Sequence, residues 1–98
     1  MKLEEKVYKK LLEVPKGRVT TYAELAKAIG LENGQRAIGR IMNRNPYPVI
    51  IPCHRVILSS GKVGGYAWGE NVKVKMLSKE GVKIKNGRIL HSNIIYRF

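Results

Sequence analysis

The sequence contains a single cysteine in 98 residues. One thiol cannot form an intramolecular disulfide, so the chain is not one of the small secreted domains that disulfides hold together. Cys53 is therefore available for chemistry in a reducing compartment. One cysteine and two histidines are also too few for the four ligands of a structural zinc site. We expect no metal and no cofactor.

Long hydrophobic runs are missing as well. A membrane-spanning helix needs about 20 apolar residues, whereas the longest apolar stretch here, Pro48–Pro52, is interrupted by its own prolines. The first residues include acidic side chains and lack the apolar segment of a secretory signal. These absences favour one small soluble domain, cytoplasmic, with no membrane partner.

Acidic residues are scarce, and they are unevenly placed. Nineteen Lys and Arg face seven Asp and Glu, a net charge of +12. No acidic residue occurs between Asn33 and Gly69, a stretch that holds several basic ones: Arg36, Arg40, Arg44, Arg55 and Lys62. Charge of one sign in mid-chain predicts a nucleic-acid footprint. The alternative is a solvated basic surface.

The hydrophobic and turn patterns predict a small, mainly α domain with a C-terminal β-hairpin. Helices are expected over residues 3–13, from Thr21 to Ile29, over 35–43 and over 71–80, with an extended link at 18–20 and a hairpin over 82–90. Thr21 and Glu24 match a capping box, and Gly30 suits the end of that helix. Leu25, Ala28 and Ile29 form its expected inner face. The pair Asn86–Gly87 is a strong hairpin turn.

The predicted third helix has two faces. Its apolar face comprises Ile38, Ile41 and Met42. Its basic face carries Arg36, Arg40 and Arg44, four residues apart and therefore on one side. Two short helices and a tight turn make a helix-turn-helix, here winged-helix-like because of the hairpin. Ala37 and Gly39 are small enough to let the helix approach a nucleic acid, although helix packing explains them equally well.

The segment Pro52-Cys53-His54-Arg55 is the strongest candidate for chemistry. Positively charged neighbours favour the thiolate, which is the nucleophilic form of cysteine. His54 and Arg55 are adjacent to Cys53, and the segment follows a proline at the end of an extended apolar run. The alternative is a buried cysteine that acts only as a small hydrophobic residue.

Glu80 is the expected third member of this group. It lies one and two helical turns after Met76 and Val72, so it continues their predicted buried stripe. A carboxylate that points inward needs a partner, and a histidine is suitable. The alternative is a frayed helix end with Glu80 in water.

Several motifs together resemble the O6-alkylguanine-DNA alkyltransferases, in the order of that family and over nearly the whole chain. They are Val14-Pro15-Lys16-Gly17, Thr21-Tyr22, Arg36-Ala37-Ile38-Gly39, Asn45-Pro46, Ile51-Pro52-Cys53-His54-Arg55-Val56, Ser59-Ser60-Gly61, Gly64-Gly65-Tyr66 and Leu77 to Glu80-Gly81. The resemblance implies one catalytic and DNA-binding domain over residues 1–98, without the N-terminal domain that the family usually carries.

The resemblance also implies catalytic roles. Cys53 would take the alkyl group from guanine O6 irreversibly, His54 would draw the thiol proton through a water, and Glu80 would orient His54. Asn45 would hold the turn before the active site. Tyr22 would hydrogen-bond guanine N3 and help to protonate the leaving base.

The implied substrate pocket and DNA contacts follow from the same motifs. The expected pocket residues are Tyr22, Val56, Tyr66, Ala67 and Trp68, with the carbonyls of Cys53 and Val56 accepting from the exocyclic amine of guanine. The expected DNA-binding residues are Arg36, Ala37, Gly39, Arg40 and Arg44. Arg36 would fill the gap left by the flipped base. Trp68 is expected as a lid over the pocket or, alternatively, as a core residue.

Three functions remain open. The first is a single-turnover alkyltransferase acting as a monomer on duplex DNA that contains O6-alkylguanine. The second is an alkyltransferase-like protein that binds the lesion and recruits other repair factors. Proteins of that kind place another residue, often tryptophan, at the position of Cys53, so the cysteine favours transfer. The third is a helix-turn-helix regulator with a structural cysteine.

Overall fold

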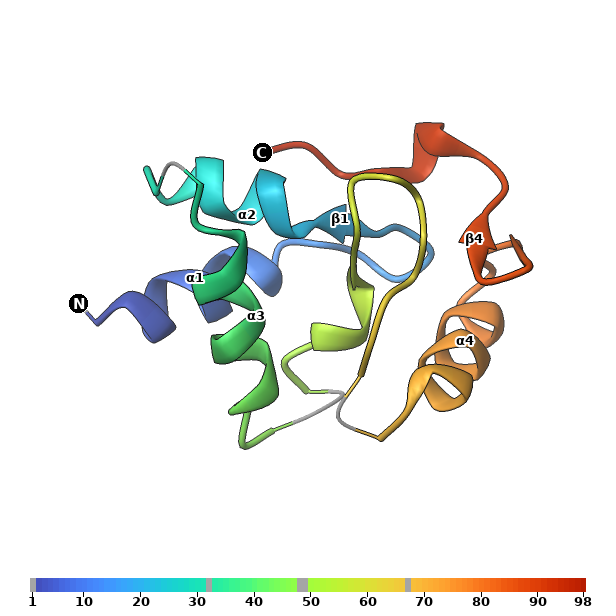
Figure 1. Ribbon diagram of the computed structural model, residues 1–98, viewed down its shortest axis with the longest axis horizontal. Helices are drawn as coiled ribbons and strands as arrows, with labels where there is room; N and C mark the ends of the chain where they lie inside the picture. The colour runs from blue at the N-terminus through green and yellow to red at the C-terminus, as the bar shows by residue number, and fades with distance from the viewer. Residues whose placement is uncertain (1, 32, 48–49, 67) are drawn as a thin grey trace.

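The computed structural model describes residues 2–31, 33–47, 50–66 and 68–98. Within them the chain is mainly α with a small hairpin, which confirms the predicted fold class. The elements are α1 (Leu3–Leu11), β1 (Thr20–Thr21), α2 (Tyr22–Ala28), α3 (Gln35–Asn43), the 3₁₀ turn η1 (Cys53–Arg55), β2 (Val56–Ile57), α4 (Glu70–Lys79), β3 (Ile84–Lys85), β4 (Arg88–Ile89) and the 3₁₀ turn η2 (Ser92–Ile94). Figure 1 shows α1, α2 and α3 on one side and α4 with the hairpin on the other.

Local sequence signals place the helix ends. The Thr21 hydroxyl accepts a hydrogen bond from the Glu24 amide at 3.0 Å, as the capping box predicts. Gly30 has φ +76°, a left-handed conformation that suits glycine just after a helix. The helix α3 has the predicted bounds. Its arginines, Arg36 and Arg40, are exposed, as is Arg44 at its C-cap.

Two predicted apolar faces need correction. In α2 the buried residues are Leu25 and Ala26, whereas Ala28 and Ile29 are half-buried. This short helix contacts both α1 and α3, so its buried face is turned toward Ala26. In α4 the buried residues are Lys73 and Leu77, and the predicted stripe of Val72 and Met76 is only half-buried.

Residues 18–20 do more than link two helices. Thr20 and Thr21 form β1, which pairs in parallel with β2 through Thr20–Val56 and Thr21–Ile57. On its other side the C-terminal tail adds a parallel bridge between Val19 and Ile95. The three segments are far apart in the sequence, and no local pattern predicts their pairing.

Two hydrophobic clusters meet at these strands. One cluster joins α1, α2, α3 and η1 and contains Cys53 and Val56. The other joins α4, the hairpin and the tail and contains Ile57. Successive strand residues point to opposite faces, so β2 contributes Val56 to one cluster and Ile57 to the other. The segment Cys53–Arg55 therefore leads from the first cluster into the strand that contributes to both.

The apolar run before Cys53 is less regular than an extended strand. Pro48 and Val49 lie outside the described residues, and Ile50 is in a turn with 74% of its surface exposed. In the part of the chain that the structure describes, no helix is long and apolar enough to cross a membrane.

Candidate active site and DNA-binding surface

Cys53 begins the one-turn helix η1 and is only 5% exposed. The loop before it is held by Asn45, whose Nδ2 donates to the Ile51 carbonyl at 2.9 Å and whose Oδ1 accepts from the Tyr47 amide at 2.9 Å. The Cys53 amide donates to the same Ile51 carbonyl at 2.7 Å. Asn45 thus fixes the turn between α3 and η1, which is the place that the sequence resemblance gives it.

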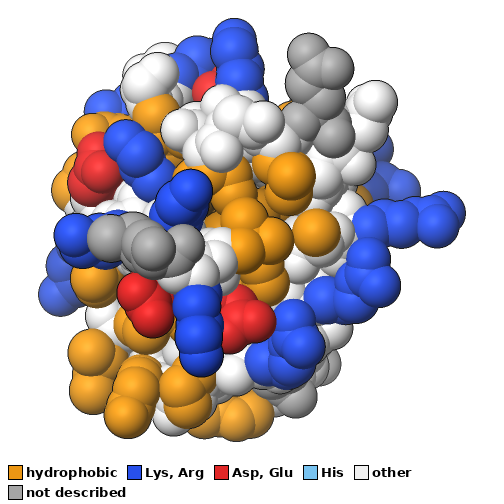
Figure 2. Space-filling view, turned by 90° about the vertical axis from the view of Figure 1, so that its left-hand side faces the viewer, with side chains coloured by type: hydrophobic (Ala, Val, Ile, Leu, Met, Phe, Trp, Pro, Cys, Tyr) orange, Lys and Arg blue, Asp and Glu red, His pale blue; other side chains and the backbone are white. Residues whose placement is uncertain are grey.

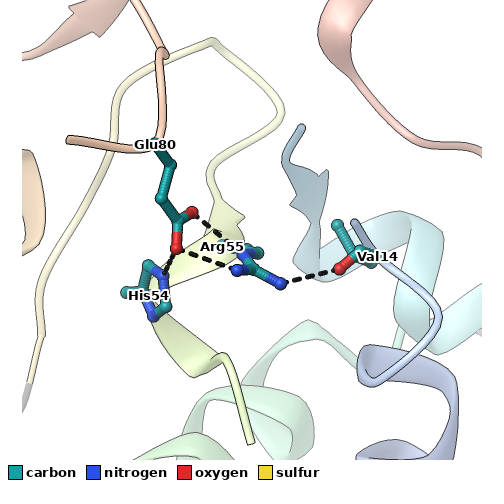
Figure 3. Close-up of polar contacts among 4 residues, drawn as sticks. All are labelled: Val14, His54, Arg55 and Glu80. Carbon is teal, nitrogen blue, oxygen red and sulfur yellow. Dashed lines mark hydrogen bonds and ion pairs between the residues drawn. The ribbon is translucent and has the colours of Figure 1, made fainter. Parts of the chain in front are cut away.

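Glu80 clamps the segment that follows Cys53 (Figure 3). Its Oε2 accepts from His54 Nε2 at 2.9 Å and from an Arg55 Nη at 2.8 Å, and its Oε1 accepts from Arg55 Nε at 2.9 Å. A second Arg55 Nη donates to the Val14 carbonyl at 2.9 Å. The expected contact of Glu80 with His54 is present, and the frayed-end alternative is wrong because the Glu80 side chain is 11% exposed.

Arg55 differs from its expected use. It was expected to add positive charge beside Cys53, but its guanidinium group is bound to Glu80 and to Val14. Paired with the Glu80 carboxylate, Arg55 contributes little net charge to the thiol. Its arrangement instead joins η1, the end of α4 and the turn after α1 (Figure 3).

The protonation state of the His54 ring is set by its burial and by Glu80. Burial lowers the pKa of His54, an effect that the hydrogen bond to Glu80 opposes without reversing. Burial alone would raise the pKa of Glu80, but the hydrogen bonds from Arg55 and His54 outweigh it and lower that pKa. Near neutral pH this leaves a neutral imidazole beside a carboxylate, with Nε2–H donating to Glu80. His54 Nδ1 is then the basic atom, and it is buried with no hydrogen-bond partner among the described residues.

Two tyrosines approach the buried thiol. The pKa of Tyr66 is raised to about 12, first by burial and then by Cys53. The pKa of Tyr22 is raised by burial and again by Cys53. Both rings pack against the hydrophobic cluster that contains Cys53. The structure therefore gathers two of the three aromatic side chains of the expected pocket around Cys53.

Trp68 lies at the edge of this group. Its ring makes an edge-to-face contact with Tyr66, with centroids 5.7 Å apart. Trp68 is 53% exposed, so the alternative of a core residue is wrong. Ala67, also expected in the pocket, lies outside the described residues.

A surface hollow connects the pocket side of the molecule with α3. It is lined by Tyr22, Gln35, Arg36, Gly39, Leu58 and Ser59. Arg36 and Tyr22 therefore border one concavity, although they come from different helices. Figure 2 shows basic side chains spread over the face that includes the α1 end of the molecule, with a row of them along its right-hand edge.

Lys73 is the functional candidate that sequence reasoning missed. It is fully buried on α4, and its Nζ donates to the Val56 carbonyl at 2.6 Å and to the Gly65 carbonyl at 3.2 Å. Lysine is by default a solvated residue, so nothing in its position alone predicts burial. The spacing to other residues does give a signal. Lys73 lies four residues before Leu77 and seven before Glu80, so the three side chains share one face of the helix.

Comparison with known proteins identifies the family. The family described as 6-O-methylguanine DNA methyltransferase, DNA binding domain, matches residues 2–82. The chain belongs to this family. It is 40% identical over 84 residues to a methylated-DNA–protein-cysteine methyltransferase of Candida glabrata, and 51% identical over 81 residues to one of Thermococcus barophilus.

Solved members of the family share the fold. The structure of Mycobacterium tuberculosis OGT in complex with DNA has a TM-score of 0.80 and 41% identity, with 83% of this chain and 49% of that chain covered. S. pombe Atl1, in complex with damaged DNA containing O6-carboxymethylguanine, has a TM-score of 0.86 and 29% identity, and both chains are covered fully.

The matches cover less than half of the methyltransferases but all of Atl1. The match to the Candida glabrata protein covers 86% of this chain but only 41% of that protein. The match to the Thermococcus barophilus protein covers 82% of this chain and 45% of that protein. Family membership and fold follow from the matches. The activity of the longer relatives does not follow for a chain that spans less than half of them.

Proposed function

We propose that this chain repairs DNA by transferring an alkyl group from guanine O6 to its own Cys53, once per molecule. The observation that carries the proposal is the arrangement on η1: a buried thiol next to a histidine whose Nε2 is bound to Glu80 and whose Nδ1 is unpartnered among the described residues. These three side chains would serve as the nucleophile, the base and the group that orients the base.

The transfer is a direct displacement at the alkyl carbon. The thiol proton passes to His54 Nδ1, directly or through a water. Cys53 Sγ forms the new carbon–sulfur bond as the carbon–oxygen bond to guanine O6 breaks, and the electron pair of that bond remains on guanine. Tyr22 supports protonation of guanine, which leaves as the normal base. Tyr66 and Trp68 contribute flat surfaces for the base, which must leave the stack to reach Cys53.

DNA binding is assigned to α3. Arg36, Arg40 and Arg44 are exposed on one side of this helix, and Gly39 between them lines the hollow that Arg36 and Tyr22 share. The small residues Ala37 and Gly39 let the helix approach the duplex, and Arg36 holds the space of the flipped nucleotide. The ligand is double-stranded DNA containing O6-alkylguanine, bound by one copy of the chain without a metal or cofactor.

The experiment is intact-protein mass spectrometry after incubation with a duplex that contains O6-methylguanine. The proposal predicts a gain of one CH₂ unit on Cys53 and no gain in Cys53→Ser, because a hydroxyl is not ionised by the same neighbours. The Cys53→Ser protein should still bind the modified duplex. A methylated serine variant, or an unmodified wild-type protein after prolonged incubation, would contradict the proposal.

A second candidate function is favoured by the full-length match to Atl1. In this alternative the chain binds the alkylated base and recruits other repair factors without efficient transfer. The same experiment separates the two functions, since a protein of this second kind would prefer the modified duplex over normal DNA yet keep its original mass.

A further inference from the structure

Two adjoining hollows form a groove between α1 and α2. They share Lys10 and Ala28 in their lining, so one continues into the other. The first also includes Lys6, Lys9 and Ile29, and the second includes Lys27. Together the two hollows are called the α1–α2 groove, with these four lysines at its sides and Ala28 and Ile29 as its apolar floor.

The α1–α2 groove opens away from the surface assigned to DNA. Tyr22 lines the hollow that it shares with Arg36 of α3. At about 3.6 residues per turn, Lys27 and Ala28 flank the point of α2 that is opposite Tyr22. The groove and the hollow beside Arg36 therefore lie on different sides of α2, and a duplex held by α3 leaves the groove open.

The groove carries more positive charge than its own carboxylates neutralise. Its two carboxylates are Glu13, which pairs with Lys10 at 3.5 Å, and Glu24, which pairs with Arg97. Three exposed lysines of the groove have no carboxylate partner among the described ion pairs: Lys6, Lys9 and Lys27. The surface is thus complementary to a ligand with several negative charges.

Apolar surface lies between these charges. Ala28 and Ile29 are half-buried, and Ile29 packs against the core cluster that contains Cys53. Phe98 lines the second hollow with 38% of its surface exposed, and Lys10 Nζ lies 5.7 Å from the centroid of its ring. A ligand that fits the whole groove needs apolar side chains as well as carboxylates.

The composition of the groove favours a protein segment over the other anionic partners. A phosphate backbone would use the lysines but not the apolar floor, and it would meet the carboxylates of Glu13 and Glu24. A second copy of the chain is disfavoured because each copy has seven acidic residues and a net charge of +12, so two copies repel each other. An amphipathic helix with acidic and apolar residues matches both features, and such helices bind in grooves of this kind.

We propose that the α1–α2 groove binds an acidic, amphipathic segment of another protein. The carboxylates of that segment pair with Lys6, Lys9 and Lys27, and its apolar side chains cover Ala28 and Ile29. Because the groove is on the other side of α2 from the DNA hollow, the segment and a duplex bind together. The proposal goes beyond alkyl transfer, and it holds whether or not Cys53 accepts an alkyl group.

The first experiment locates the binding surface on the wild-type protein. The probe is a synthetic helical peptide of Glu, Leu and Ala with its acidic and apolar residues on adjacent faces, and the readout is the ¹⁵N–¹H amide spectrum of the protein. The peptide should shift amides of residues 6–13 and 24–29. A peptide with Gln in place of Glu, and one with Ser in place of Leu, should each bind more weakly. Unchanged groove amides, or shifts concentrated at residues 35–43, would overturn the proposal.

The second experiment separates the groove from the general attraction of a basic protein for an acidic peptide. The groove variant combines Lys6→Gln, Lys9→Gln and Lys27→Gln. The matched control combines Lys75→Gln, Lys83→Gln and Lys85→Gln, three exposed lysines of α4 and the hairpin region, and it has the same net charge. By fluorescence anisotropy at low salt, the groove variant should bind the labelled peptide about tenfold more weakly, while the control keeps most of the affinity. Equal losses in both variants would overturn the proposal.

A third experiment tests the competing nucleic-acid reading of the same groove. An unmodified DNA duplex is added to the wild-type protein with the peptide already bound. The duplex should shift amides of α3 and leave the peptide in place. Displacement of the peptide, with shifts of the groove amides by DNA alone, would make the groove a second nucleic-acid surface and overturn the proposal. None of these readouts depends on Cys53, so failure to gain mass from methylated DNA would contradict the proposed function and not the groove.

Discussion

At the scale of single residues, the site depends on one carboxylate that accepts hydrogen bonds from two side chains, the Arg55 guanidinium group and the His54 ring. Glu80 receives two hydrogen bonds from Arg55 and one from His54, all between 2.8 and 2.9 Å. An amide in its place has one oxygen and no charge, so it cannot accept all three. Glu80→Gln should lower the free energy of unfolding by about 1.5–3 kcal/mol and slow alkyl transfer, because His54 loses the group that fixes its tautomer. Urea unfolding and single-turnover rates measure the two effects.

The control for Glu80 is Glu13, whose ion pair with Lys10 is exposed. Glu13→Gln should change the free energy of unfolding by less than about 1 kcal/mol.

The pH dependence of stability gives a second check on the contacts of Glu80. The folded-state pKa values of Glu80 and His54 are both lowered, so their contribution is present above the unfolded values and is lost as the pH falls. Wild-type stability should therefore fall from about pH 6.5 downward. Below about pH 4.5, where the Glu80 carboxylate is protonated in the unfolded chain, a less steep loss is expected for Glu80→Gln. Parallel curves for the two proteins would contradict the clamp.

Residue contacts were predictable where the chemistry of the side chain is specific. A carboxylate on the inward side of a helix needs a partner, and the histidine next to the cysteine offers one, so the contact between Glu80 and His54 could be predicted. Lys73 and Arg55 were not predictable in the same way, because a basic residue in a basic chain is by default assigned to solvent or to DNA. Only the packing of α4 against η1 shows that one is buried at the pocket and the other is bound to Glu80.

At the scale of elements, α3 presents the arginines and the hollow that adjoins Tyr22. Arg36 borders that hollow, whereas Arg44 is near the other end of the helix and pairs with Glu4 at 3.7 Å. Arg36→Ala should slow repair of duplex DNA far more than reaction with free O6-methylguanine, because extruding a base costs a few kcal/mol that the free base does not require. Arg44→Ala is the control and should affect the two substrates without this large difference. An equal loss on both substrates in Arg36→Ala would assign that side chain to folding or chemistry instead.

The strands explain which parts of the fold the sequence could not predict. Helix ends follow from neighbouring residues such as Thr21, Glu24 and Gly30, and these predictions are confirmed. The pairing of β1 with β2 and with the tail depends on residues 36 to 76 positions apart. Such pairing leaves little trace in a local pattern, so the tail, weakly patterned in sequence, gave no sign that it completes the sheet.

The tail should therefore contribute to stability. The buried Thr20 hydroxyl donates to the Tyr96 carbonyl at 2.9 Å, and the Arg18 guanidinium group donates to the Ile94 and Ile95 carbonyls. Thr20→Val keeps the shape and removes the donor, so it should lower the free energy of unfolding by about 1 kcal/mol and increase hydrogen exchange at the Tyr96 amide. Unchanged exchange at that amide would show that the tail is held by its apolar contacts alone.

At the scale of the whole molecule, the net charge of +12 should appear in the salt dependence of DNA binding. Each neutralised phosphate contributes about −0.9 to the slope of log affinity against log salt on duplex DNA.

Arg40 and Arg44 should contribute differently to this slope. Arg44 has Glu4 beside it, whereas Arg40 has no carboxylate partner among the described ion pairs. Arg40→Ala should therefore reduce the slope by about one phosphate contact, and Arg44→Ala by less, since Glu4 already offsets part of its charge. Fluorescence anisotropy over a range of salt concentrations measures both slopes on the same duplex. A wild-type slope near zero would remove the electrostatic basis for DNA binding, and a larger change for Arg44→Ala than for Arg40→Ala would show that the duplex displaces Glu4 and contacts the far end of α3.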